Sequence, residues 1–408
     1  MNQFSDTLEN QYTASRQASV ASMDAVLEAY LGSKQTVMPL LDSLIAADPE
    51  MPMARCLRAY LLKLASDPRL HDPIMADLTV LIEQSDAMNS REQLHLRALT
   101  SWVANQLLDT IETLELLLES YPKDMLALRI AHYLHFYAGN AVNMRDSVAR
   151  SAAVWRDTDT YYGYLLGMQS FGLEESGDYA SAETLGRQAI DINPSDIWAG
   201  HAVTHVLQMQ QRYREGIPWI ESLAPHWDAT NNFSYHLYWH KGLVYIGTGE
   251  LDAALALYDQ HLVDVLSDDF YLDICNAASL LWRLEMRGVN VGRRWQALQS
   301  LSAARVTDDE LIFSTLHYLM APARLHDQPA INRAMAHLQQ WSRARTTQGE
   351  ICRDVGLPVA NALISIGRGD VKQAANQLNA IQDKIYLIGG SHAQRDLFTQ
   401  IQHYYATA

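Results

Sequence analysis

The chain has 408 residues and carries 31 Lys and Arg against 47 Asp and Glu, a formal net charge of −16. No basic run occurs, and because phosphate contacts need clustered Lys and Arg, nucleic acid is not an expected partner. No stretch approaches the roughly 18 apolar residues of a membrane span, and the N-terminus lacks a secretory pattern, so we expect a cytoplasmic protein without a membrane partner.

Helices are the elements that the apolar spacing predicts along the chain. We expect a frayed N-terminus over residues 1–18 and about four helices over 19–85, one of which ends at "AADP". No strand pattern is found. The cysteines Cys56, Cys275 and Cys352 are far apart and form no CxxC pair, so we interpret them as reduced core residues.

A repeat organises the middle of the chain. The stretch "GYLLGMQSFGLEESGDYASAETLGRQAIDINP" has the spacing of one tetratricopeptide unit, which is two antiparallel helices in about 34 residues. Such a unit needs small residues where its helices touch, a turn near its middle and a proline at its end. Counted from Gly163, positions 8, 15, 17, 20, 27 and 32 are Ser170, Gly177, Tyr179, Ala182, Ala189 and Pro194.

The same register recurs in units that start at residues 91, 125, 163, 197 and 235, with spacings of 34, 38, 34 and 38. The longer spacings place loop insertions near "WRDTDT" and "HWDATNN". The clearest repeats cover 91–268, with degenerate repeats before and after and a capping helix at about 391–405. We predict an all-α fold, one α-solenoid over 19–408 that curves into a closed or near-closed superhelix.

Two histidine pairs recur almost one repeat apart, in "HAVTH" (His201 and His205) and "HLYWH" (His236 and His240). The register places them at positions 5 and 9 of one unit and positions 2 and 6 of the next, which face the concave side of a tetratricopeptide array. Consecutive first helices pack roughly 8–10 Å apart, so four imidazoles could approach one point. They could hold a divalent metal, zinc or iron, or act as general acids and bases.

Other inward-facing residues surround these pairs in the register. The alternative is that these residues have no role in binding. A histidine on a groove, in particular, is most often solvated or hydrogen-bonded within the protein. HExxH, which would add a general base, does not occur, and neither do GxSxG, GxGxxG or a P-loop. The neighbouring candidates for ligand contacts are Trp198, Gln208, Trp239 and Asp273, with His95 at position 5 of its own unit.

The chain resembles the tetratricopeptide repeat protein 38 family from about residue 35 to its end. The strings that carry the resemblance are "REQLHLRA", "DMLALRIAHYLHFYAGN", "MRDSVAR", "HAVTHVLQM", "YWH", "YD" at 258–259, "GRRWQAL", "RDVGLP" and "GGSHAQRD". Generic tetratricopeptide consensus does not require these strings, so they are specific to the family.

The resemblance implies a cytoplasmic helical-repeat protein and supplies no activity. The family has an acid where this chain has Gln208, and that departure argues against a simple His-His-Glu metal site. The resemblance implies shared residues at His95, His132, His201, His205, His236, His240, Asp273, His317, Arg353, Asp354, Arg395 and Asp396.

The two C-terminal charge pairs allow two interpretations. Arg353–Asp354 and Arg395–Asp396 either tie the terminal helices together or bring arginines to the histidine pocket, where they would hold a carboxylate or phosphate. Gly389 and Gly390 would permit a sharp re-entry of the final helix.

The sequence therefore favours a binding protein with a histidine-lined concave pocket for a small molecule or a peptide. The ligand contacts would include His132, His317, Arg353 and Arg395 besides the residues named above. The alternative is an enzyme in which His201, His205, His236 and His240 are the catalytic acids and bases or the metal ligands.

Overall fold

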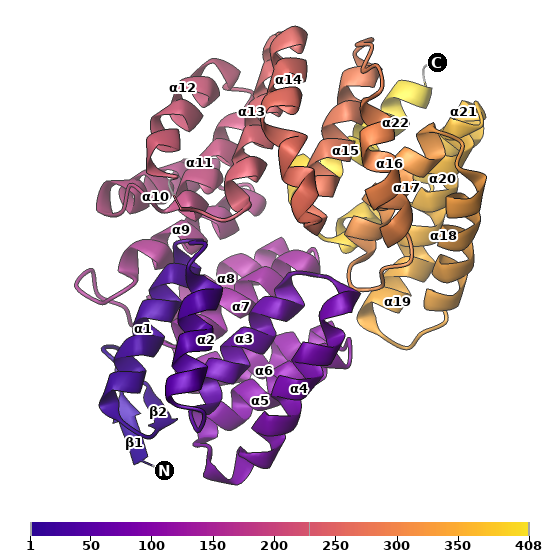
Figure 1. The fold of residues 1–408 in the computed structure, drawn as a ribbon. Coiled ribbons are helices and arrows are strands. Elements are labelled where there is room, and N and C mark those ends of the chain that lie inside the picture. The colour runs from indigo at the N-terminus through magenta and orange to yellow at the C-terminus, as the bar shows by residue number, and fades with distance from the viewer. Residues whose placement is uncertain (1, 228, 407–408) are drawn as a thin grey trace. The chain divides into compact units, whose positions relative to one another are not determined.

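A computed structural model describes residues 2–227 and 229–406 of the protein (Figure 1). Helices make up nearly all of its regular structure, as the sequence predicts. The α-helices are α1 Gln17–Leu31, α2 Val37–Ala47, α3 Pro52–Leu64, α4 His71–Glu83, α5 Ser90–Val103, α6 Leu107–Ser120, α7 Met125–Tyr137, α8 Ala141–Ala152, α9 Tyr162–Glu175, α10 Tyr179–Ile192, α11 Ile197–Met209, α12 Tyr213–Leu223, α13 Phe233–Thr248, α14 Leu251–Leu257, α15 Tyr271–Met286, α16 Arg294–Arg305, α17 Ile312–Arg324, α18 Gln328–Trp341, α19 Thr347–Ile351, α20 Leu357–Gly367, α21 Val371–Asn379 and α22 His392–Ala406. Shorter helical turns are Pro68–Leu70, Ser85–Ala87, Ala224–His226, Tyr258–Leu262, Asp264–Asp268, Cys352–Gly356 and Gln382–Ile388.

The helices form two compact units. Unit 1 comprises Met1–Phe136, Asn140–Val206 and Glu221–Phe233, and unit 2 comprises Tyr137–Gly139, Leu207–Ile220 and Ser234–Ala408. The sequence predicted one array without a division. Two of the boundaries fall inside α11 and at the start of α13, so no proline- or glycine-rich linker marks them in the sequence.

Each predicted repeat is a pair of helices in the structure. The units that start at 91, 125, 163, 197 and 235 correspond to α5–α6, α7–α8, α9–α10, α11–α12 and α13–α14. The position-8 residues Ala98 and Ser170 are fully buried, as helix contact requires. Gly186 of α10 shows how close the helices lie, since a Cβ there would lie 2.5 Å from Val203 Cγ2. The all-α fold of tetratricopeptide-like helix pairs is therefore confirmed.

Glycine followed by aspartate sets the turn inside two of the repeats. Gly177 and Gly369 have φ of +87° and +82°, a left-handed conformation that favours glycine. The next residues, Asp178 and Asp370, accept hydrogen bonds from backbone N–H groups in the first turns of α10 and α21. The left-handed turn and the cap together end one helix and start the next.

Residues 2–18 form regular structure, which corrects the prediction of a frayed end over residues 1–18; residue 1 lies outside the described residues. Strands β1 Asn2–Ser5 and β2 Gln11–Ala14 pair as an antiparallel hairpin. Tyr12 is buried, and its ring lies 4.3 Å from the guanidinium carbon of Arg91. The Thr13 backbone and hydroxyl donate to Glu92 at 2.7 and 2.6 Å. These long-range contacts hold a segment whose own four-residue strands are too short to be stable alone.

The final helix begins after a glycine turn, as the sequence predicts. Gly389 and Gly390 have φ of +78° and +82°, and a Cβ on Gly389 would lie 2.5 Å from the carbonyl oxygen of Tyr137, in the same unit. α22 then buries an apolar face that includes Phe398.

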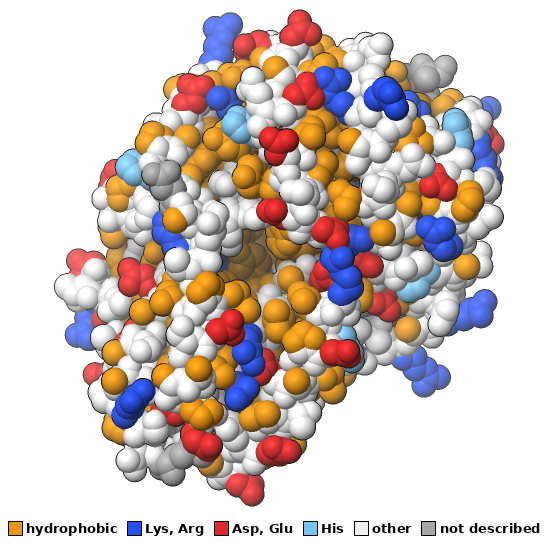
Figure 2. Space-filling view, viewed as in Figure 1, with side chains coloured by type: hydrophobic (Ala, Val, Ile, Leu, Met, Phe, Trp, Pro, Cys, Tyr) orange, Lys and Arg blue, Asp and Glu red, His pale blue; other side chains and the backbone are white. Residues whose placement is uncertain are grey.

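The distribution of charge on the surface and the length of the helices agree with the sequence, which has no basic run and no long apolar stretch. On the face drawn in Figure 2, Lys and Arg side chains are scattered among Asp and Glu. In the part of the chain that the structure describes, no helix is long and apolar enough to cross a membrane.

Candidate functional site

His201 and His205 lie one turn apart on α11, in unit 1. Both side chains are buried, and their Nε2 atoms are 3.0 Å apart. The ring centroids are 4.4 Å apart and the ring planes are nearly perpendicular, at 77°. In this arrangement one Nε2–H donates to the lone pair of the other, so the two nitrogens share one proton.

Two carboxylates that the sequence analysis did not single out lie beside His205. Glu174 and Glu175 end α9, and one oxygen of each lies 3.5 and 3.9 Å from His205 Nδ1. A carboxylate beside Nδ1 favours the Nδ1–H tautomer, which puts the lone pair of the ring on Nε2. The two glutamates occupy positions 12 and 13 of the unit from Gly163, so the repeat register is the signal that would have found them.

The second pair lies in unit 2 and has the geometry of the first. The rings of His236 and His240 are 4.7 Å apart at 76°. Nδ1 of His236 lies 3.0 Å from Asn276 Oδ1, and Nδ1 of His240 lies 2.8 Å from Gln208 Oε1. Each amide oxygen accepts from Nδ1–H, so the lone pair again lies on Nε2. Gln208, which replaces an expected acid, thus orients an imidazole.

The donor chemistry of both pairs suits a metal ion. Histidine ligands of metals usually bind through one neutral ring nitrogen while the other ring N–H donates to an oxygen. In each pair, a nitrogen of one ring lies within 4.8 Å of a nitrogen of the other. The buried histidine and glutamate groups could therefore hold a metal ion. That all four imidazoles share one point stays a prediction, because the two pairs belong to different units.

An aromatic cluster surrounds Trp198, at the start of α11 in unit 1. Its indole is 4% exposed and packs against rings from α7, α9, α11 itself and the start of α13. The indole thus lies at the junction of three consecutive first helices. The contacting rings, at centroid distances of 5.0, 5.1, 5.4, 5.6 and 5.7 Å, are Phe171, Tyr133, Phe233, His201 and His132.

A buried guanidinium covers this indole. The Cζ atom of Arg129, on α7, lies 4.1 Å from the Trp198 ring and 4.8 Å from the Tyr133 ring. Its Nη2 donates to the Tyr133 hydroxyl at 3.3 Å. The sequence analysis did not name Arg129, although position 5 of the unit from Met125 faces inward in the register.

Two titratable neighbours of Arg129 have shifted pKa values. Burial raises the pKa of Asp196 to about 6, although two backbone N–H groups and Arg129 act in the opposite direction. Burial lowers the pKa of His132 well below its usual value, and the charge of Arg129 acts in the same direction. The imidazole of His132 is therefore neutral near pH 7.

His95 lies in a network in unit 1 that differs from the Trp198 cluster. Its Nε2 lies 2.9 Å from Asp124 Oδ2 and its Nδ1 lies 3.3 Å from the Tyr60 hydroxyl. Asp124 also accepts from Arg91 Nη1 at 2.6 Å. Both ring nitrogens thus face protein partners, and we assign His95 a structural role in joining three helix pairs.

Three predicted ligand residues are buried in unit 2. The Trp239 indole donates to Ser279 Oγ at 2.8 Å, and Asp273 lies in the first turn of α15. The Nδ1–H of His317 donates to the Phe313 carbonyl at 2.8 Å. Burial lowers the pKa of His317 to about 4.

The two predicted arginines have different environments. Arg353 is exposed and donates to the adjacent Asp354 at 2.8 Å. Arg395 is buried in α22 and donates to the Gly390 carbonyl. Arg353 thus forms a surface ion pair with the adjacent residue, and Arg395 ties α22 to the glycine turn before it.

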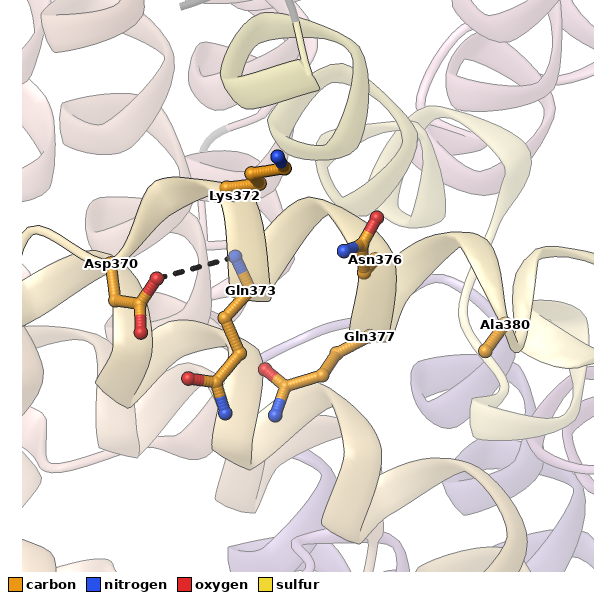
Figure 3. Close-up of a pocket in the computed structure, with 6 residues that line it drawn as sticks. All are labelled: Asp370, Lys372, Gln373, Asn376, Gln377 and Ala380. Atoms are coloured by element: carbon orange, nitrogen blue, oxygen red, sulfur yellow. Dashed lines mark hydrogen bonds between the residues drawn. The ribbon is translucent and has the colours of Figure 1, made fainter.

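A shallow hollow on α21 is lined by Asp370, Lys372, Gln373, Asn376, Gln377 and Ala380 (Figure 3). Its side chains come from one helix and its ends, and all but Gln377 are exposed. Asp370 accepts from the Gln373 backbone as a helix cap. The hollow has neither an aromatic wall nor a buried charged group, so it is not a candidate site.

No known protein-family profile matches the chain. A crystal structure of a Rap protein complexed with competence and sporulation factor aligns over 87% of this chain and 98% of that chain, with a TM-score of 0.44 and 10% sequence identity.

Proposed function

We propose that the protein is a helical-repeat binding protein, and that unit 1 binds a small molecule or a peptide where α7, α9 and α11 meet. The observation that carries the proposal is the cluster around Trp198, in which Arg129 and the imidazoles of His132 and His201 lie against one indole. Ligand sites combine aromatic walls with a few polar groups that fix the orientation of the ligand.

The composition of the cluster argues against a purely structural role. A core aromatic cluster needs no charge, and burying a guanidinium without a carboxylate partner is unfavourable. Among the described residues, no carboxylate lies within ion-pair distance of Arg129, which is 2% exposed. A bound anion would supply the missing partner.

An enzyme is the second candidate, and one observation favours it. Glu174, His205 and His201 lie in a row, at 3.5 Å and then 3.0 Å. Such a row can accept a proton at an imidazole while the carboxylate stabilises the imidazolium that forms. The same row could instead orient His205 as a ligand of zinc or iron.

We further propose that the chain belongs to the tetratricopeptide repeat protein 38 family. The strings "DMLALRIAHYLHFYAGN" and "HAVTHVLQM" support this, because they contain Arg129, His132, His201 and His205. In this proposal the ligand site of unit 1, with His132, His201 and His205, is common to the family.

The test is to identify what the purified full chain contains. Mass spectrometry of compounds released on denaturation and elemental analysis should find a small molecule, and that compound should rebind the emptied protein. Trp198→Leu should weaken rebinding about tenfold or more. The matched control is Trp155→Leu, since Trp155 is also buried in unit 1 and donates to the Pro122 carbonyl. Equal losses in both variants, or no compound bound from a broad metabolite and peptide library, would overturn the proposal.

A further inference from the structure

Four residues of unit 1 bring buried polar atoms without hydrogen-bond partners into one neighbourhood. Among the described residues, these atoms are Arg129 Nε, both ring nitrogens of His132, Trp198 Nε1 and Asp196 Oδ2. The four side chains are at most 4% exposed. Buried polar groups in native proteins are nearly always paired, so this concentration points to a partner that completes them.

The four residues are close together. The Arg129 guanidinium lies 4.1 Å from the Trp198 ring, and the His132 ring lies 5.7 Å from the same ring. Asp196 caps α11 by accepting from the Trp198 and Ala199 N–H groups through Oδ1, both at 3.1 Å. The charge of Arg129 influences both Asp196 and His132.

Gly167 of α9 lies close to the second oxygen of this carboxylate. A Cβ at Gly167 would lie 3.0 Å from Asp196 Oδ2. That oxygen therefore lies against the neighbouring first helix, and a larger residue at position 167 would crowd it.

The available groups are both donors and acceptors. Arg129 Nε–H and Trp198 Nε1–H can donate, and the planar fork of a guanidinium matches a planar carboxylate. Asp196 Oδ2 accepts, and an ammonium group would satisfy it. A dianionic phosphate fits less well, because Asp196 adds a negative charge to the same neighbourhood when ionised.

We propose that this neighbourhood binds an α-amino acid with an apolar or aromatic side chain. Its carboxylate pairs with Arg129 and the Trp198 N–H, and its ammonium group pairs with Asp196. The side chain of the ligand packs among the rings of Phe171, Tyr133 and Phe233, which surround the indole. This inference rests on the proposed function and names the class of its ligand.

The test compares three forms of each apolar and aromatic amino acid by calorimetric titration of the full chain. The zwitterion should bind, while the N-acetyl form lacks the ammonium group and the amide form lacks the carboxylate. Each derivative should bind at least about tenfold more weakly than the zwitterion, because a site built for hydrogen bonds rejects analogues that lack them.

Variants then test which protein residue contacts the ammonium group of the ligand and which contacts its carboxylate. Asp196→Asn should weaken binding of the zwitterion and leave the N-acetyl form unchanged, while Arg129→Lys should weaken both. Arg97→Lys is the matched control, since Arg97 is exposed on α5 in the same unit. If a variant fails to fold, the comparison of ligand forms on the wild type still decides.

Three results would overturn the inference: no amino acid binds, derivatives bind as tightly as zwitterions, or binding is unchanged in Arg129→Lys. If the library screen described above still finds a ligand that depends on Trp198, the proposed function stands and only the ligand class is wrong. If that screen also finds none, both proposals fail.

Discussion

Nε2 of His205 lies 3.0 Å from Nε2 of His201, one turn earlier on the same helix. Once the proton that they share leaves, the two nitrogens at this separation can bind one divalent ion, because neighbouring ligands about 2.0–2.1 Å from an ion lie roughly 3 Å apart.

We therefore expect Zn²⁺ or Co²⁺ to stabilise the protein against thermal unfolding. At about a hundredfold excess over the dissociation constant, the gain should be about 2–3 kcal/mol. A His201→Gln/His205→Gln variant should lose much of the gain, while His403→Gln, an exposed control on α22, should keep it. Equal stabilisation of the wild type and the double variant would rule out this pair as ligands. The number of ions per chain tests the expectation that all four imidazoles share one ion.

Asp196 should make the protein more stable as the solution is acidified. Its folded pKa is about 6 and the usual value is 3.8, so the folded state holds the proton more tightly than the unfolded chain. The unfavourable burial of the carboxylate is present above pH 6 and is relieved as the pH falls toward 4. Relative to Asp196→Asn, the wild type should gain roughly 1 kcal/mol between about pH 7 and 5 in urea unfolding. If the difference in unfolding free energy between the two proteins did not change with pH, the pKa of Asp196 would not be raised in the folded state.

His317 should have the opposite effect in unit 2. Burial lowers its pKa from 6.5 to about 4, so the unfolded chain takes up the proton first as the pH falls. The stability it contributes is complete above about pH 6.5 and is lost between about pH 6.5 and 4. Relative to His317→Gln, the wild type should lose roughly 2 kcal/mol between about pH 7 and 5. Parallel unfolding curves for the two proteins would contradict this assignment.

Glu92 should be needed to dock the N-terminal hairpin. Its carboxylate accepts from the Thr13 backbone and hydroxyl and from the Asn89 N–H that starts α5. Glu92→Ala removes the acceptor of all three hydrogen bonds and should destabilise the protein by about 2–4 kcal/mol. Limited proteolysis should then cut within residues 2–14, while Glu112→Ala, at an exposed position on α6, should leave them protected. Continued protection of the hairpin in Glu92→Ala would show that Tyr12 and Arg91 are sufficient.

The repeats could be predicted because local spacing determines them. Ala98 and Ser170 are small where helices touch, and Gly177 has the left-handed conformation that its turn requires. The hairpin could not be predicted in the same way, because its partners are remote. Thr13 and Glu92 are 79 residues apart, and the strands themselves show no apolar alternation.

The candidate site was predictable only in part, for a chemical reason. Spacing identified the pair His201 and His205, because histidines four residues apart are recognisable without a structure. Arg129 and Glu174 also occupied inward positions, but single charged residues on helices are common and most are solvated. Only the structure shows that both are buried and what they contact. It likewise shows that Asp124 engages His95.

The hairpin also constrains the order of events during synthesis. Asn10 donates to the Lys123 carbonyl, 113 residues later in the chain, and Thr13 must wait for Glu92. At roughly 5–20 residues per second, the ribosome needs on the order of ten seconds to make this intervening stretch. Tyr12 and Thr13 lack their contacts with Arg91 and Glu92 until α5 has been made. The hairpin therefore docks only after the chain has been made as far as Lys123, although unit 1 itself continues to Phe233.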